Sequence, residues 1–226
     1  MDGFRITAIV WRKAVAIFLR ERTEVRIAEE AAVSLKTAQK MAHHLRLTMA
    51  AEVPELFSGD VEMDEAYIGG QRKNKRLHIR RIQGKRGHGT DKLPIVGLFS
   101  RKTGQVFVVV EPKKLDVKFV FAIIEERVAK GSRILTDGFK MYRGLPAIGY
   151  AHEFVDHNDG EYVRGDVHTN NMEGFWGIMK RKLGCVGGMR RDRLHLFVAE
   201  IVWKFNHRNE TLVERERSLL RLIFRK

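Results

Sequence analysis

The chain has 226 residues, 42 of them Lys or Arg and 28 Asp or Glu, which gives a formal net charge of +14. A hydrophobic fraction of 44% is enough to bury a core, and this excludes a wholly disordered protein. The length fits one large domain, or a medium domain with a small one. The positive excess indicates a polyanionic partner, with nucleic acid first and a membrane surface second.

The single cysteine, Cys185, excludes an internal disulfide framework and a Cys-rich zinc module. The apolar runs are too short to span a bilayer, and the N-terminus lacks the pattern of a signal peptide. We therefore expect a soluble, cytoplasmic protein that has no membrane partner.

The first zone, residues 6–50, contains neither Gly nor Pro and carries apolar residues at helical spacing. This pattern predicts a helix, a short turn at residues 32–34 and a second helix. Ser34 is the expected N-cap of the second helix, because its hydroxyl can accept from the amides of the following turn.

The second zone, from about residue 60 to residue 150, changes to the alternation of strands. Residues 61–68 alternate apolar and polar and stop at Gly69 and Gly70. Further on, the pattern predicts strands at 94–100 and 105–111 that form a hairpin, a helix at 115–130 and a short strand at 132–136. This order indicates an α/β domain whose three leading strands are antiparallel. A third zone, residues 170–226, is predicted to be helical again.

The segment between the first two strands is strongly basic. Residues 71–92 hold nine Lys and Arg, one acid and three glycines. A charge run of this kind is often only a solvated loop, but the net charge of the chain favours an arm that contacts DNA. The residues expected to make these contacts are Arg72, Lys73, Lys75, Arg76, Arg80, Arg81, Lys85 and Arg86.

Acidic side chains on two strands and one helix are the candidate catalytic groups. Asp64 lies at the centre of the first strand, and Asp137 directly follows the short strand. In the next helix Asn170, Glu173 and Lys180 fall on one face. Two aspartates with a Glu or Asn make an oxygen-only ligand set, which suits Mg²⁺ or Mn²⁺. Two such ions can activate a water or a 3′-hydroxyl for phosphodiester transfer, and Lys180 would contact a phosphate.

These blocks resemble the bacterial insertion-sequence transposases of the DDE type. The first block is VEMDEAYIGG at 61–70, the second is LTDG at 135–138 with Tyr142, and the third is HTNNMEGFW at 168–176 with Lys180. A closing helix at 195–208 completes the match, which covers roughly residues 11–208. The resemblance is closest to the insertion-sequence fifteen-ninety-five family, whose active site is Asp-Asp-Asn/Glu-Lys.

The resemblance implies an RNase H-like fold, a mixed five-stranded sheet flanked by helices, preceded by an all-α helix-turn-helix segment. Residues 1–53 would be the DNA-binding segment, and residues 54–226 the catalytic domain with its basic C-terminal helices. The recognition helix, residues 34–45, would present four side chains to a major groove, and a fifth residue, on the later helix, would also contact DNA. These five residues are Lys36, Thr37, Gln39, Lys40 and Arg181.

Carried onto this chain, the family's catalytic residues are Asp64, Asp137 and Lys180, with Asn170 or Glu173 at the third position. We favour Glu173 as the metal ligand, because a carboxylate binds Mg²⁺ better than an amide and Lys180 follows it at i+7. The family's Asn/Glu choice keeps Asn170 among the candidates.

We expect a transposase that cleaves and joins DNA by in-line displacement, with Mg²⁺ or Mn²⁺ as two bound ions. Its partners would be the element ends and the target DNA, bound by a homo-oligomer in the bacterial cytoplasm at the nucleoid. Two alternatives stay open. Family members often begin with a Cys-rich zinc ribbon that this sequence lacks, so one alternative is an N-terminally truncated, inactive DNA-binding relic. The other is a metal-dependent nuclease without strand transfer.

Overall fold

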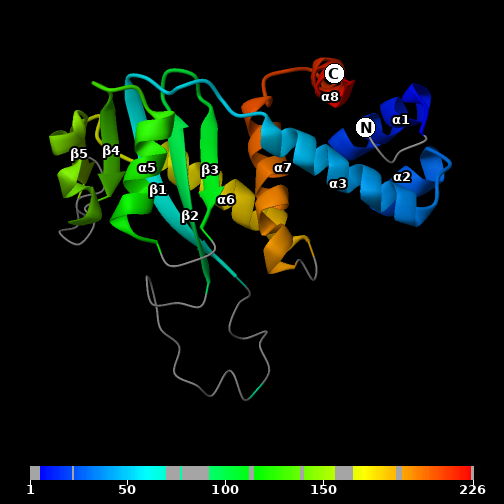
Figure 1. Ribbon diagram of the computed structural model, residues 1–226, viewed down its shortest axis with the longest axis horizontal. Helices are drawn as coiled ribbons and strands as arrows, with labels where there is room; N and C mark the ends of the chain where they lie inside the picture. Colours follow the sequence, from blue (N-terminus) through cyan, green and yellow to red (C-terminus); the bar gives the residue numbers. More distant parts are fainter. Residues whose placement is uncertain are drawn as a thin grey trace. The chain divides into compact units, whose positions relative to one another are not determined.

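The computed structural model describes residues 6–21, 23–69, 77, 92–111, 115–137, 140–155, 165–186 and 190–224 (Figure 1). The chain divides into two compact units, one of Met1–Val53 with Ala199–Lys226 and one of Pro54–Val198. From Ala199 on, the C-terminal helices are grouped with the N-terminal segment, whereas the sequence was expected to place them with residues 54–198; the functional roles assigned to the two segments stay predictions. None of the helices in the described ranges has the length and apolar character that a membrane span requires.

Both ends of the chain build the helical unit. Its elements are α1 (Ala8–Leu19), α2 (Glu24–Glu30), α3 (Leu35–Ala51), the later part of α7 (Leu194–Asn206) and α8 (Leu212–Phe224). Trp11 and Phe18 of α1 share one buried cluster with Trp203 of α7 and with Leu219 and Ile223 of α8. The N-terminal helices therefore complete their core with residues from the far end of the sequence.

The predicted turn and cap are present in this unit. Ser34 precedes α3, and its Oγ accepts a hydrogen bond from the backbone N–H of Thr37 over 3.1 Å. In the turn Ala32 adopts φ +54°, a left-handed conformation that costs an alanine about 1–2 kcal/mol. Helix, turn and helix thus follow one another as expected between Glu24 and Ala51.

The prediction of one continuous helix before that turn is wrong. The chain breaks into α1 and α2, with Glu21 at φ +59° and Thr23 as the residue before α2. Phe18 and Ile27 are both buried in the shared cluster. Nine residues of a straight helix would place these two side chains on opposite faces, so the helix must break for both to reach one core.

The second unit is built on a mixed sheet. Its strands are β1 (Asp60–Ile68), β2 (Leu93–Ser100), β3 (Val106–Val110), β4 (Arg133–Asp137) and β5 (Ala151–Val155), in the order β3-β2-β1-β4-β5. The first three strands pair antiparallel, whereas β4 lies parallel to both β1 and β5. This topology confirms the expected RNase H-like fold. β5 had no pattern of its own in the sequence, because it is an edge strand with mostly exposed side chains.

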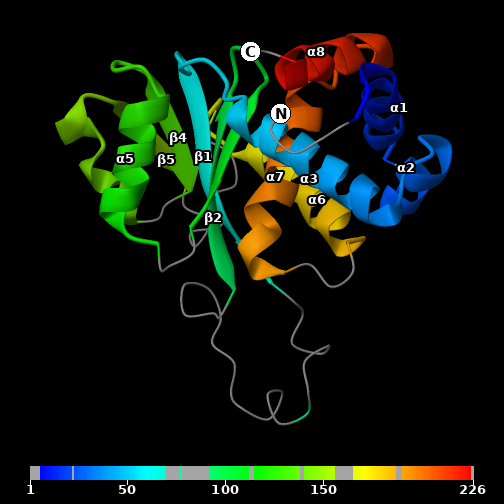
Figure 2. The same cartoon turned by 45° about the vertical axis from the view of Figure 1, so that its right-hand side comes forward.

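Helices cover both faces of this sheet. The remaining elements are α5 (Val117–Arg127), α6 (Asn170–Gly184) and the short 3₁₀ helices η3 (Lys140–Gly144), η4 (Pro146–Ile148) and η6 (Arg191–Arg193). α5 and α6 lie on opposite faces (Figures 1 and 2). Val61 and Met63 of β1 pack in one core with Ile124 of α5. Because side chains alternate along a strand, Glu62 and Asp64 face α6.

A glycine sets how closely α6 approaches the sheet. Gly97 of β2 pairs with Asp64 across the antiparallel ladder. A Cβ at this position would lie 2.2 Å from Cε of Met172 and 2.6 Å from the ring of Trp176, both on α6. The absence of a side chain therefore lets α6 lie directly over the centre of the sheet.

We expect Gly97→Ala to lower the free energy of unfolding by about 1–3 kcal/mol, because the added methyl group overpacks this contact. Gly177→Ala is the matched control, since a Cβ at that position of α6 meets nothing within 4 Å. The control should stabilise the protein by about 0.5–1 kcal/mol through helix propensity. Urea denaturation of both variants measures the difference. Equal effects of the two substitutions would contradict the close approach.

Candidate active site

Strand register brings the two predicted aspartates together. β1 and β4 run parallel, with Glu62 paired to Leu135. Two residues further along each strand are Asp64 and Asp137, which therefore lie level on neighbouring strands. Asp137 is the last residue of β4, so both carboxylates lie toward the edge of the sheet where parallel strands end.

A third carboxylate completes this cluster. Within the described part of the chain, Asp64, Glu65 and Asp137 each offer an oxygen, and these oxygens all lie within 4.8 Å of one another. Asp64 Oδ2 accepts a hydrogen bond from Trp176 Nε1 over 2.9 Å, and Oδ1 accepts one from the backbone N–H of Glu65 over 2.8 Å. On the other side Glu65 accepts a hydrogen bond from the hydroxyl of Tyr142.

Burial and the neighbouring negative charges make Asp64 and Glu65 hard to ionise. Burial raises the pKa of Asp64 from its ordinary 3.8 to about 6, and the charges of Asp137 and Glu173 add to the rise. Burial likewise raises the pKa of Glu65 to about 7 despite the hydrogen bond from Tyr142. A divalent cation would relieve this repulsion, and carboxylate oxygens are the ligands that Mg²⁺ and Mn²⁺ prefer.

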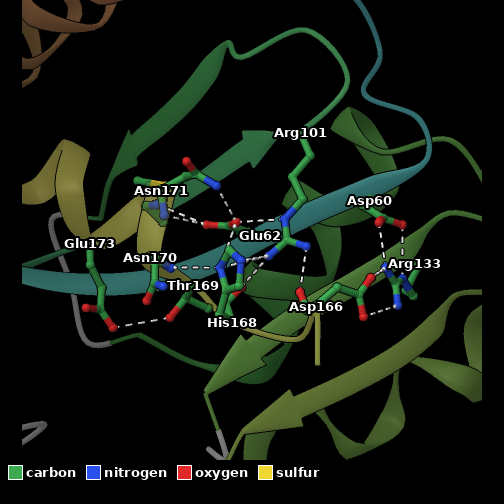
Figure 3. Close-up of polar contacts among 11 residues, drawn as sticks. Asp60, Glu62, Arg101, Arg133, Asp166, His168, Thr169, Asn170, Asn171 and Glu173 are labelled. Carbon is green, nitrogen blue, oxygen red and sulfur yellow. Dashed lines mark hydrogen bonds and ion pairs between the residues drawn. The ribbon is translucent and has the colours of Figure 1, made fainter. Parts of the chain in front are cut away.

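The other predicted residues, Asn170, Glu173 and Lys180, all lie on α6, the helix that packs against β1 and β2. Glu173 lies in its first turn, and its carboxylate accepts a hydrogen bond from the hydroxyl of Thr169 over 3.3 Å (Figure 3). Its charge acts on the pKa of Asp64, although it lies outside the group of three carboxylates. Asn170 and Lys180 are exposed positions of the same helix. Contacts and charge thus connect α6 to Asp64, and the identity of the third metal ligand stays a proposal.

The beginning of α6 is attached to β1 by a buried carboxylate. Glu62 is fully buried and accepts hydrogen bonds from the backbone N–H groups of Asn171 and Met172 over 3.0 and 3.1 Å. It also accepts from Asn171 Nδ2 over 2.7 Å and from Arg101 Nε over 2.8 Å (Figure 3). Beside it Arg133 pairs with Asp60 and Asp166.

Sequence reasoning missed Glu62, Glu65 and Arg101. Glu65 follows a predicted catalytic residue, and strand alternation directs it to the opposite face, so it does not share the predicted face of Asp64. Only the fold brings Tyr142 and Asp137 to it. A signal for Glu62 was present in the sequence, since positions 62 and 64 are both acidic and lie on the same face of the strand. A strand that is covered on both faces has no solvent-exposed side, so a carboxylate at position 62 must be buried and must have hydrogen-bond partners.

The predicted DNA contacts fall in three places. Lys36, Gln39 and Lys40 are exposed on α3, and Thr37 is half-buried there, with its hydroxyl 2.9 Å from that of Ser34. Arg181 is exposed on α6. The predicted contacts of the basic segment lie outside the described residues: Arg72, Lys73, Lys75, Arg76, Arg80, Arg81, Lys85 and Arg86.

Asp64 gives the metal-free protein a characteristic pH dependence. The folded state keeps a proton on Asp64 up to about pH 6, whereas the unfolded chain releases it near 3.8, so unfolding releases a proton between these values. The free energy of unfolding therefore falls as the pH rises through this window. Asp64→Asn should remove this fall. The free energy of unfolding of the variant minus that of wild type should therefore increase by about 2 kcal/mol between pH 4 and pH 7.

Denaturation with EDTA present measures this difference at each pH. Asp60→Asn is the control with the opposite sign, because Arg133 lowers the pKa of Asp60 and the ionised form stabilises the fold. That variant should lose stability at neutral pH. A stability difference between Asp64→Asn and wild type that is constant from pH 4 to pH 7 would contradict the raised pKa.

Comparison with known proteins identifies the family of the chain. The chain matches the family described as the ISXO2-like transposase domain over residues 56–206. An uncharacterized protein in transposable element ISH50 of Halobacterium salinarum is 34% identical over 192 residues, a match that covers 81% of this chain and 65% of that protein. The chain therefore spans about two thirds of the length of this relative. An uncharacterized transposase-like protein of Haemophilus influenzae is 27% identical, with coverage of 46% and 82%.

Among solved structures, one similar chain comes from the simian T-cell lymphotropic virus intasome in complex with PP2A regulatory subunit B56 gamma. The TM-score is 0.43 at 13% identity, and the match covers 87% of this chain and 69% of that one. The family match is the more specific finding, because it takes in all five strands and α6. Since it extends over 151 of the 226 residues, the chain belongs to the ISXO2-like transposase family, the fifteen-ninety-five group of insertion sequences that its motifs resemble.

Proposed function

We propose that the protein catalyses metal-dependent cleavage of DNA strands and their transfer to a target, by in-line displacement at phosphorus. The observation that supports this most directly is the cluster of Asp64, Glu65 and Asp137, whose oxygens lie within 4.8 Å of one another. Family membership and the net charge of +14 fit the same substrate, a polyanionic nucleic acid.

In this proposal Asp64 and Asp137 hold two Mg²⁺ or Mn²⁺ ions, with Glu173 as the third ligand from α6. Bound ions of this kind lower the pKa of an attacking water or 3′-hydroxyl and stabilise the leaving oxygen. Asp64 keeps lone pairs free for a cation after accepting hydrogen bonds from Trp176 and from the backbone N–H of Glu65. Glu65 is a further candidate ligand, oriented by Tyr142. Asn170 is the alternative to Glu173.

The remaining residues would bind the substrate. The exposed Lys36, Gln39 and Lys40 of α3 are available for a DNA groove, as the recognition helix of a helix-turn-helix requires. Lys180 and Arg181 of α6 would contact phosphates near the cluster, where they offset its negative charge. Two element ends must be brought together for transfer, so we propose that the protein acts as a homo-oligomer on DNA.

Asp64→Asn and Asp137→Asn should each lower the single-turnover rate of Mg²⁺-dependent end cleavage by more than about 100-fold while DNA binding is kept. A labelled DNA end reports both nicked and joined products. Nicks without joined strands would favour a nuclease, and binding without any cleavage in Mg²⁺ or Mn²⁺ would exclude the proposed activity. Glu173→Gln compared with Asn170→Ala identifies the third ligand as the residue whose loss abolishes cleavage.

A readout without DNA tests the metal site separately. The chain has three tryptophans, and only Trp176 donates its indole N–H to Asp64 among the described residues. Paramagnetic Mn²⁺ should therefore broaden the indole signal of Trp176 selectively in a protein with ¹⁵N-labelled tryptophan. The signal is assigned with Trp176→Phe. Selective broadening that persists in Asp137→Asn would contradict a site between the two aspartates.

The double variant Lys36→Ala with Lys40→Ala should weaken DNA binding and reduce the slope of log affinity against log salt by about 2, one for each lost phosphate contact. Lys13→Ala with Lys118→Ala is the matched control, because it removes the same charge from exposed positions of α1 and α5. Fluorescence anisotropy at a series of salt concentrations measures both slopes. Identical slopes would exclude α3 as the recognition helix.

A further inference from the structure

Glu62 is an unusual residue at the centre of a sheet, since its side chain is completely buried. A buried carboxylate is tolerated only when its oxygens are satisfied by strong donors. Its two oxygens accept four hydrogen bonds, from Arg101 Nε, from Asn171 Nδ2 and from the backbone N–H groups of Asn171 and Met172. Three of the four donors belong to the beginning of α6. Glu62 therefore accepts from first-turn backbone N–H groups that have no acceptor within their own helix, which is distant from Glu62 in sequence.

Arg101 extends this attachment to the segment before α6. Its Nη1 donates to the carbonyl oxygen of Asp166 over 2.7 Å, and its Nη2 donates to the carbonyl oxygen of His168 over 3.0 Å (Figure 3). Nη2 also lies 2.9 Å from Nδ1 of the His168 ring. One guanidinium group thus connects Glu62 to the residues that lead into α6.

A second attachment lies further along the same helix. Trp176 Nε1 donates to Oδ2 of Asp64, two residues from Glu62 on β1. Two residues of an extended strand cover about 6.7 Å, and four to five residues of an α-helix cover about 6–7.5 Å. The two spacings match, so β1 and α6 are joined at two points over corresponding lengths of strand and helix. Glu173 lies between these two points on the helix.

We propose that Glu62 and Arg101 are a positioning pair that fixes α6 along β1 and thereby sets where Glu173 stands relative to Asp64 and Asp137. The pair touches neither substrate nor metal in this scheme. It acts through the helix, whose first turn carries the third ligand. This inference rests on the proposed function of the cluster as a metal site. The positive end of the helix also favours a carboxylate at this place, which explains why the strand supplies an acid.

Glu62→Gln tests the pair with almost no change in size. The amide keeps one acceptor oxygen but loses the charge and the second acceptor, so the donors of Asn171, Met172 and Arg101 can no longer all be satisfied. Asp60→Asn is the matched control. It makes the same chemical change on the same strand, to a carboxylate that pairs with Arg133 and is not bonded to α6 within the described residues.

We expect Glu62→Gln to shift the indole signal of Trp176 in the metal-free protein, because the second attachment point moves with the helix. The Mn²⁺ concentration for half-maximal broadening should rise, and the single-turnover cleavage rate should fall by about 100-fold at unchanged DNA affinity. Asp60→Asn should leave the indole signal, the Mn²⁺ response and the cleavage rate within about twofold of wild type. A selective fall in rate at constant affinity separates positioning from a general loss of the folded state.

An unchanged indole signal and Mn²⁺ response in folded Glu62→Gln would overturn the proposal, as would equal effects of Glu62→Gln and Asp60→Asn. If Glu62→Gln does not fold, Arg101→Lys decides, because lysine keeps the charge but cannot reach all of the acceptors that the guanidinium bridges. Arg101→Lys should likewise shift the indole signal of Trp176 and raise the Mn²⁺ concentration for half-maximal broadening. If neither changes, the proposal is overturned. If wild type does not cleave DNA, the proposed activity fails, while the indole and Mn²⁺ signals still test the pair.

Discussion

The candidate site depends on three carboxylates that the sheet holds closer together than their charges favour. Strand register places Asp64 and Asp137 level on parallel strands, while Glu65, the residue after Asp64, is held in the cluster by the hydroxyl of Tyr142. Burial, and after it the neighbouring negative charges, raise the pKa values of Asp64 and Glu65. The apolar core on the α5 face, with Val61 and Met63, provides the stability that keeps the strands in place. Functional sites commonly hold such locally unfavourable groups at the expense of stability.

The second determinant is how α6 is fixed to the sheet. On the face away from α5, Gly97 permits the approach of Met172 and Trp176, while Glu62 and Asp64 accept hydrogen bonds from the same helix. Apolar contacts bring two elements together with little directional preference, whereas hydrogen bonds to backbone amides and an indole fix one position along the axis. The hydrogen bonds from Asn171, Met172 and Trp176 therefore fix the position of α6 along β1.

Much of the fold could be predicted from local pattern, because alternation and capping depend on neighbouring residues. The strand at 61–68, the Ser34 cap and the helix at Asn170 are of this kind, and family resemblance supplied the five-stranded sheet. β5 could not be found from pattern, since an exposed edge strand has no apolar alternation. The break between α1 and α2 was also hidden, because it is imposed by a core that includes distant residues.

The candidate site could be anticipated only in part from the sequence, and the roles of its residues stay predictions. Asp64, Asp137 and Glu173 stand in recognisable motifs, whereas Glu62, Glu65 and Arg101 acquire their roles only through contacts with residues far along the chain. Glu62 and Met172 are separated by 110 positions, and Glu65 and Tyr142 by 77. A pattern of neighbouring residues cannot predict a hydrogen bond between residues that are so far apart in the sequence.

The shared core of the helical unit also affects how the protein is made. Trp11, Phe18 and the other N-terminal core residues leave the ribosome long before Trp203, Leu219 and Ile223, which complete their cluster. At synthesis rates of about 5–20 residues per second the interval between Val53 and Ala199 is roughly 7–30 s, during which the first helices lack part of their core. The strands and α6 are synthesised within that interval. A nascent chain would therefore complete its helical unit last, so that a chain interrupted before α8 would carry its three N-terminal helices without the core that α8 supplies.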